Sequence, residues 1–147
     1  MRPLKILHVE DNEEDLILFR RACDAAGLPA IFHPVWDGSQ AVAYLKGEGE
    51  YQDRHSYPLP DLVVLDLNLP RMSGFDFLKW LRGHPGFGRL PVLVFTVSEK
   101  AEDKTRALAE GAIGYFVKPK DFATLVRLAE SFRKFRLNGH DKNDELT

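Results

Sequence analysis

Residues that could do chemistry follow four apolar runs of the sequence. They are Glu10 and Asp11, then Asp66 with Asn68 two residues later, then Thr96, and finally Lys118. A short apolar run bounded by turn residues, such as 62–65, is typical of a strand buried on both faces. The carboxyl ends of parallel strands meet at one edge of a sheet, and open α/β sheets place ligands there. The spacing therefore predicts that these side chains share one site.

The acidic members of this set predict a metal site. Three carboxylates placed together repel one another and need a cation. Carboxylates, a backbone carbonyl and water are ligands that suit Mg²⁺. We expect Asp11 and Asp66 to bind the ion directly, with the backbone carbonyl of Asn68 as a third ligand. Glu10 has a longer side chain and is expected to hold a metal-bound water.

The remaining members indicate phosphoryl transfer onto an aspartate. Lys118 offers a positive charge to an anion, and Thr96 offers a hydroxyl donor. A carboxylate nucleophile, a divalent metal, a lysine and a hydroxyl together suit this reaction. Asp66 would be the in-line nucleophile, while the metal and Lys118 neutralise the phosphoryl oxygens.

Each of these residues also has an ordinary structural explanation. Glu10 and Asp11 could only cap a helix, and Asp66 could form a turn. Thr96 could be a simple strand residue, and Lys118 a solvated charge in a loop. These explanations do not account for all four positions coinciding at equivalent strand ends, so we favour a functional site.

Five strand–helix units position these residues. Such alternation predicts right-handed crossovers and an α/β fold, with a parallel sheet covered by helices on both faces. Residues 47–60 interrupt the pattern with glycine, proline and polar residues, which predicts a long surface loop. We expect strands at 4–9, 30–35, 62–65, 90–97 and 113–117, and helices at about 13–26, 39–46, 74–82, 99–110 and 122–137.

Composition limits the classes of function. A chain of 147 residues predicts one domain, and 20 basic against 22 acidic residues give no sign of nucleic-acid binding. No apolar stretch is long enough to span a membrane, and the N-terminus has no signal-peptide pattern, so a cytoplasmic protein is expected. The single cysteine, Cys23, falls in an apolar helical pattern and is expected to be a buried structural thiol.

At this point the sequence resembles the receiver domain of two-component response regulators. The resemblance covers residues 3–137 and leaves a polar tail at 138–147. It rests on the segments 8–12, 66–70 and 115–119, together with Gly74 and Thr96. It implies a flavodoxin-like fold, with the doubly wound five-stranded sheet in the order 2-1-3-4-5. It also implies Mg²⁺ as cofactor and a sensor histidine kinase as partner, from which the domain itself transfers the phosphoryl group to Asp66.

A narrower resemblance is to the single-domain regulators that pair with bacterial and cyanobacterial phytochromes. It rests on the long loop at 47–60, the run 66–74, and the His84-Pro85 segment before the fourth strand. It implies a bacteriophytochrome as one candidate kinase. Another sensor kinase would suit the same sequence.

The family resemblance also implies a switch. On phosphorylation Thr96 would move toward the phosphoryl group, and Tyr115 would rotate into the space that it leaves. The output would be an altered face made by the fourth helix, fifth strand and fifth helix, through a shift between two populated states. The resemblance further implies a cis bond between Lys118 and Pro119.

The C-terminal part of the sequence bears on the output. About ten residues follow the last expected helix, so we expect no effector domain, and the output passes through another protein or onward as phosphate. A second apolar stripe on that helix predicts a homodimer through the face just described, the alternative being a monomer whose own tail covers the stripe. The stripe consists of Leu128, Phe132 and Phe135, of which Phe132 also fits the inward face of the same helix.

Two other functions compete with a phosphorylated receiver. A metal-dependent phosphohydrolase with an aspartyl nucleophile usually has a second aspartate two residues after the first, but this chain has Asn68 there. A docking module that is never phosphorylated would not need Asp11, Asp66, Thr96 and Lys118 together.

Overall fold

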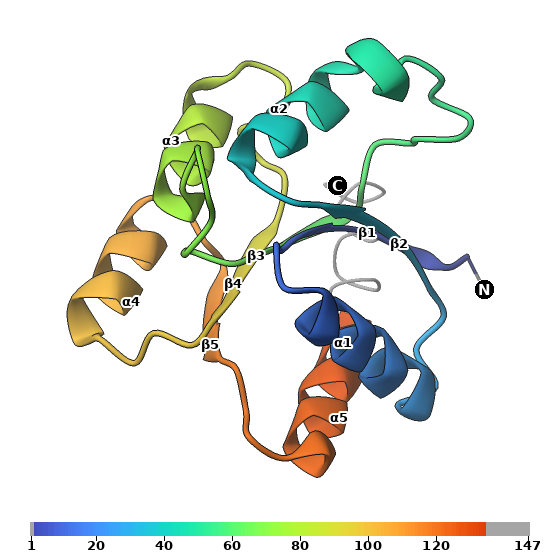
Figure 1. Cartoon of the computed structure of the whole chain (residues 1–147), viewed down its shortest axis with the longest axis vertical. Helices are drawn as coiled ribbons and strands as arrows, with labels where there is room; N and C mark the ends of the chain where they lie inside the picture. Colours follow the sequence, from blue (N-terminus) through green and yellow to red (C-terminus); the bar gives the residue numbers. More distant parts are fainter. Residues whose placement is uncertain (1, 135–147) are drawn as a thin grey trace.

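The computed structural model describes residues 2–134, in which five strands alternate with five α-helices (Figure 1). The strands are β1 (Leu4–Val9), β2 (Ala30–Val35), β3 (Leu62–Leu65), β4 (Val92–Thr96) and β5 (Gly114–Val117). The α-helices are α1 (Glu13–Ala25), α2 (Gly38–Lys46), α3 (Gly74–Gly83), α4 (Ala101–Ala109) and α5 (Phe122–Ser131). A short 3₁₀ helix, η1, spans Gly49–Tyr51.

All five strands form one parallel sheet in the order β2-β1-β3-β4-β5. The predicted doubly wound, flavodoxin-like fold and its strand order are confirmed. β3 lies at the centre and all four of its residues are buried, which explains why its sequence is apolar without alternation. The register pairs Val9 with Leu65 and Thr96 with Val117, so the carboxyl ends of these strands lie close to one another.

The two faces of the sheet carry separate helix layers, as Figure 1 shows, with α1 and α5 on one face and α2, α3 and α4 on the other. Successive side chains of a strand point to opposite faces. Val63 and Leu65 of β3 accordingly pack with the α2–α3–α4 layer, whereas Leu62 and Val64 pack with the α1–α5 layer. The buried thiol of Cys23 lies in this second layer, as expected.

Some element boundaries differ from the prediction. The fourth strand begins at Val92 instead of residue 90, because Pro91 has no N–H for the ladder, although its carbonyl accepts from Val63 N at 2.9 Å. The fourth helix begins at Ala101 instead of residue 99, because Ser98 and Lys100 form a side-chain turn before it. The last helix extends to Ser131, and the end predicted for it at residue 137 lies outside the described residues.

The 47–60 insertion is more ordered than the predicted surface loop. It contains the 3₁₀ helix η1, and the ring of Tyr51 packs 5.1 Å from that of Tyr44 on α2 and 5.2 Å from that of Tyr57. Arg54 donates to the carbonyls of Tyr44, Leu45 and Tyr57. The guanidinium thus satisfies carbonyl groups at the end of α2 and ties the insertion to that helix.

Among the helices of residues 2–134, none has the length and apolar character needed to cross a bilayer.

Candidate functional site

Three carboxylates converge at the carboxyl edge of the sheet. Glu10 and Asp11 follow β1, and Asp66 follows β3. One carboxylate oxygen from each lies within 4.8 Å of the others. Glu10 and Asp66 are buried and Asp11 is exposed, so the cluster is open to solvent on one side. The structure therefore brings together the three acidic residues that the sequence indicated.

Lys118, which follows β5, lies against this cluster. Its side chain is only 11% exposed. The amine nitrogen Nζ lies 2.7 Å from Oε1 of Glu10 and 3.2 Å from Oδ2 of Asp66. A single lysine therefore contacts two of the three carboxylates that would face a metal ion.

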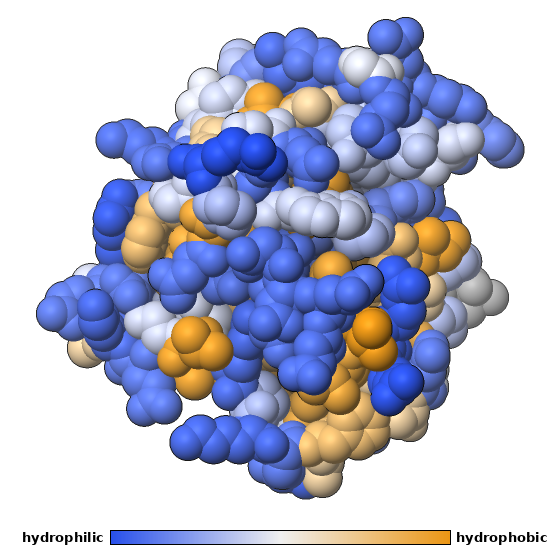
Figure 2. Space-filling view, in the orientation of Figure 1, coloured by the Kyte–Doolittle hydropathy of each residue, from blue (hydrophilic) through white to orange (hydrophobic). Residues whose placement is uncertain are grey.

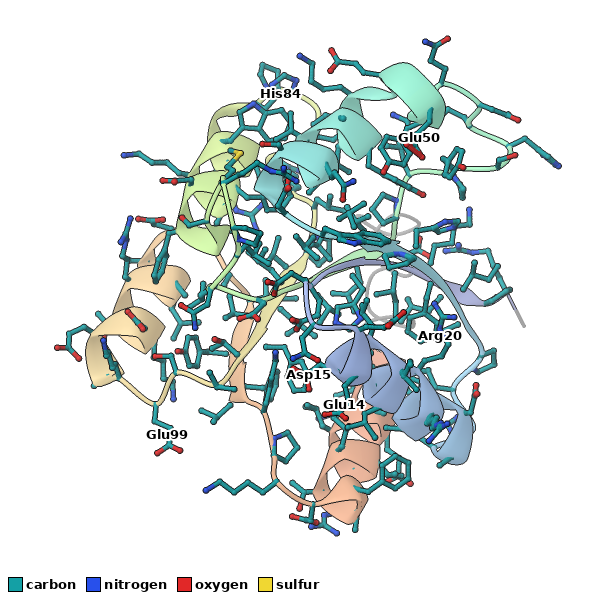
Figure 3. The ribbon with its side chains drawn as sticks, in the orientation of Figure 1. Glu14, Asp15, Arg20, Glu50, His84 and Glu99 are labelled. Carbon is teal, nitrogen blue, oxygen red and sulfur yellow. The ribbon has the colours of Figure 1, made fainter. Side chains whose placement is uncertain are left out.

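Asp15, in the first turn of α1, is a further member of the site that the pattern of strand ends did not indicate. Its Oδ2 accepts a hydrogen bond from Lys118 Nζ at 2.8 Å. Figure 3 shows Asp15 in the first turn of α1, towards the middle of the molecule, while Glu99 points outward from the loop before α4. The available signal was its place among the acidic residues in the first turn of the helix that follows Glu10 and Asp11.

The local backbone fixes the carboxylates. Asn12 caps α1 by accepting from Asp15 N at 3.0 Å, and its own N–H donates to Oε2 of Glu10 at 3.1 Å. In the same way, the N–H of Asn68 donates to Oδ1 of Asp66 at 3.2 Å. Each buried carboxylate is thus held by the backbone N–H two residues further along the chain.

The crowded charges shift proton affinities at the site. Burial raises the pKa of Glu10 to about 7; the Asp66 charge adds to this increase and Lys118 opposes it. Burial alone would lower the pKa of Lys118, but its hydrogen bonds to Asp15 and Glu10 hold that pKa above its ordinary value. Burial, aided by the Lys118 charge, lowers the pKa of His8 on β1 to about 3. At neutral pH Lys118 is therefore charged and His8 is neutral.

The two residues expected to act as a switch lie around one loop after β4. Thr96 is fully buried, and its Oγ1 accepts from Ser98 N at 3.4 Å. Tyr115 on β5 is half-buried, and its hydroxyl donates to the carbonyl of Ser98 at 3.0 Å. The backbone N–H of Lys118 donates to the Thr96 carbonyl at 2.7 Å. Both residues therefore contact Ser98, so a movement of this loop would reach them together.

One expectation about the backbone is wrong. The peptide bonds of the described residues are all trans, including that between Lys118 and Pro119. The trans form is the more stable one for X–Pro bonds by about 0.5–1 kcal/mol. In this form the Lys118 amine already reaches Glu10 and Asp66, so a cis bond is not needed to direct it inward.

The residues predicted to form one apolar interface stripe do not share one environment in the structure. Phe132 is buried, and its ring lies 5.7 Å from that of Phe19. Leu128 is partly buried and packs against the same core, while Phe135 lies outside the described residues. The assignment of Phe132 to an exposed stripe is therefore wrong, because the side chain fills the core between α1 and α5.

A groove runs from the acidic cluster along α1. Its volume is about 560 Å³, and Glu10 and Asp11 form part of its wall. Ile17 of α1 and Trp36, at the end of β2, are exposed apolar members of the same wall. A partner that reaches Asp66 from this side would therefore meet an apolar surface beside the carboxylates.

A five-stranded parallel sheet in this order, with acids and a lysine at its carboxyl edge, defines a class of signalling domain. Residues 6–130 match the model of the response regulator receiver domain, and the chain belongs to this family.

Several relatives are regulators associated with phytochromes. Response regulator Rcp1 of Synechocystis sp. is 30% identical over 92% of this chain and 90% of its own, and the Mn(2+)-bound form of Rcp1 has a TM-score of 0.79 to this fold. The phosphorylated cyanobacterial phytochrome response regulator RcpA is 32% identical, with a TM-score of 0.82 over 92% of this chain and 95% of that one. RPA3017, from red light signaling of R. palustris, is 32% identical, with a TM-score of 0.85 over 91% of this chain and 93% of that one. The predicted family and its likeness to phytochrome-associated regulators are confirmed.

Proposed function

We propose that the chain accepts a phosphoryl group on Asp66 from a sensor histidine kinase, with Mg²⁺ as cofactor. The observation that carries this proposal is the position of the Asp66 carboxylate, which lies within 4.8 Å of Glu10 and Asp11 oxygens and 3.2 Å from the Lys118 amine. We further propose that the receiver domain spans residues 3–137, beyond the matched 6–130, with 138–147 as a tail.

The donor set fits a hydrated hard cation. The carboxylates of Asp11 and Asp66 and the carbonyl of Asn68 would hold Mg²⁺, and Glu10 would hold a water on it. When bound, the ion supplies positive charge that stabilises the oxygens of the transferring phosphoryl group. The exposure of Asp11 leaves the site accessible to an ion that keeps several waters. The existence of a Mn(2+)-bound form of the relative Rcp1 supports a divalent cation as a ligand of this chain.

The side chains of this protein would divide the reaction between them. An oxygen of Asp66 forms the new bond to phosphorus as the bond from phosphorus to the kinase histidine breaks. The amine of Lys118, which now contacts Oδ2 of Asp66, would then contact a phosphoryl oxygen. The hydroxyl of Thr96 would donate to another, and Tyr115 would follow it as the switch. The chain would act on its own Asp66 and not on a separate substrate.

The identity of the kinase is proposed from the comparisons. RcpA is a phytochrome regulator and RPA3017 belongs to red light signaling, so we propose a phytochrome-type sensor kinase for this chain. The groove beside α1, which Asp11 and Trp36 help to line, gives such a partner an apolar surface next to the acceptor. Figure 3 places Glu14 and Arg20, two charged residues of α1, along the helix that borders this groove.

The proposed output face is that of α4, β5 and α5, which would also form a homodimer. Large apolar side chains are exposed there, and Figure 2 shows apolar surface over α5 on an otherwise mostly polar view of the molecule. Sedimentation of Leu108→Glu/Ile113→Glu should give a monomer where the wild type is a dimer, with Ile31→Glu on β2 as the control. A wild type that is monomeric at tens of micromolar concentration would contradict this dimer. The exposed side chains are Val97, Leu108, Ile113, Val117 and Phe122.

The proposal is tested by the mass of the intact protein after incubation with acetyl phosphate. A gain of one phosphoryl group is expected with Mg²⁺, and no gain with EDTA or in Asp66→Asn. Asp61→Asn is the matched control, because Asp61 is also an ion-paired aspartate but precedes β3 instead of following it, and it is less buried than Asp66. A wild type that binds Mg²⁺ and stays unmodified, both with acetyl phosphate and with a phosphorylated histidine kinase, would instead indicate a docking module.

A further inference from the structure

The loop that carries Asn68 connects Asp66 to α3 and is held firmly at its base. The N–H of Gly74 donates to the Leu67 carbonyl at 3.1 Å. The backbone of Gly74 is so close that a Cβ there would lie 2.3 Å from the Asp66 carbonyl oxygen. The segment 67–73 thus leaves the site and returns to it within a closed turn.

The tip of this loop is held by a second set of contacts, to the start of α2. Nε of Arg71 donates to Oδ2 of Asp37 at 2.8 Å, and Nη2 of Arg71 donates to the same oxygen. Oδ1 of Asp37 accepts from Gln40 N at 2.9 Å as the N-cap of α2. The N–H of Gly38 donates to the Met72 carbonyl at 3.1 Å. Both residues at the tip are therefore bonded to the first residues of one helix.

The backbone and the burial indicate that the loop depends on this clamp. Arg71 has a φ of 60°, in the left-handed region that non-glycine residues rarely adopt. Asp37 is fully buried, and a buried carboxylate needs a partner of opposite charge. The side chain of Arg71 itself is 72% exposed, so it contributes little to the core. Its interaction with Asp37 is its main visible role.

We propose that Asp37 and Arg71 are positioning residues of the acceptor site, which fix loop 67–73 so that the Asn68 carbonyl and the Asp66 carboxylate face the same metal ion. Asn68 lies between the base of the loop at Gly74 and its tip at Arg71, so release of the tip lets its carbonyl turn away. This inference rests on the proposed function, because it assumes that Asn68 and Asp66 share a metal.

The test compares the Mg²⁺ affinity of the wild-type chain with that of the Arg71→Asn variant, both full-length and both measured by calorimetry. Asparagine tolerates the left-handed backbone, so this variant removes the guanidinium without adding strain. We expect Mg²⁺ to bind about tenfold more weakly, as when other residues that orient metal ligands are lost. The Mg²⁺ concentration needed for half-maximal labelling by acetyl phosphate should rise by the same factor.

A matched control is available at the opposite edge of the sheet. Arg2 donates to both carboxylate oxygens of Asp61, at 3.0 and 3.2 Å, before β1 begins. Arg2→Asn removes an arginine–aspartate pair of the same kind, and its Mg²⁺ affinity should equal that of the wild type. Asp37→Asn should weaken Mg²⁺ binding as Arg71→Asn does. The double variant should be no weaker than the worse single one, because the two residues act through one interaction.

The outcomes separate this inference from the proposed function. Wild-type Mg²⁺ affinity in Arg71→Asn, with only a lower stability to urea, would show a purely structural clamp and overturn the inference. A wild type that binds no Mg²⁺ would overturn it as well. A wild type that binds Mg²⁺ but is never phosphorylated would refute the proposed function, while the comparison of Mg²⁺ affinities would still decide the role of the clamp.

Discussion

Two buried groups, one on β1 and one directly after it, should give opposite pH dependences of stability in the metal-free protein. Burial raises the pKa of Glu10 from 4.5 to about 7 and lowers that of His8 from 6.5 to about 3. The exposed fractions of these residues are 1% and 2%, so solvent screens the shifts little. Between about pH 5 and 6.5 each group therefore differs in protonation between the folded and the unfolded state, whereas most exposed carboxylates are ionised in both.

The signs follow from which state holds the proton. In this range the folded protein keeps a proton on Glu10 that the unfolded chain has released, so the Glu10 contribution to stability falls as the pH rises. The unfolded chain protonates His8 while the folded protein does not, so the His8 contribution rises with pH. One proton over 1.5 pH units corresponds to at most about 2 kcal/mol in each direction. The two contributions should nearly cancel in the wild type.

Urea unfolding in EDTA, repeated between about pH 5 and 6.5, measures the two contributions separately. In Glu10→Gln the free energy of unfolding should rise with pH by up to about 2 kcal/mol, because only the His8 contribution remains. In His8→Leu it should fall by a similar amount, because only the Glu10 contribution remains. Glu102→Gln, which removes an exposed carboxylate of α4, is the control and should follow the wild-type profile. If Glu10→Gln and His8→Leu ran parallel to the wild type, the reasoning would be refuted.

Two further substitutions test how the backbone is supported, one beside the site and one at the opposite edge of the sheet. Gly74→Ala places a methyl group against the Asp66 carbonyl and should lower stability by about 1–3 kcal/mol and slow labelling by acetyl phosphate. Gly83→Ala, at the end of the same helix with open space around it, should not destabilise. Arg82→Met removes donors to three backbone carbonyls and should cost about 2–3 kcal/mol in urea unfolding. Arg89→Met, which removes an exposed arginine, should cost less than about 0.5 kcal/mol, and equal losses in the two variants would contradict this account.

The fold and the main acidic cluster could be predicted from sequence for one physical reason. Apolar runs show where strands end, and parallel strands bring their carboxyl ends to one edge. Glu10, Asp66 and Lys118 each come directly after a strand, so their proximity follows from topology without any knowledge of side-chain conformation. The strand order itself came from the family resemblance, since alternation of strands and helices permits more than one order.

Other contacts could not be predicted because they join residues that no sequence period relates. Asp37 and Arg71 are 34 positions apart, and their contact depends on a left-handed backbone at an arginine. The burial of Phe132 could not be predicted either, because its helical spacing fits an inward and an outward stripe equally well. Only the packing of α5 against α1, where its ring contacts Phe19, places it in the core.

The electrostatics of the acceptor site suggest why its arrangement suits a reversible signal. One buried lysine contacts three carboxylates, namely those of Glu10, Asp15 and Asp66, which leaves the site short of positive charge when no metal is bound. Burial raises the pKa of Glu10 and the Asp66 charge adds to this increase, so a divalent cation at this edge would favour the ionised carboxylate. A phosphoryl group on Asp66 would add negative charge and draw Lys118 away from its present partners. The repulsion between the carboxylates at this edge would therefore favour binding of the metal ion. Lys118 would change its contacts when Asp66 is phosphorylated.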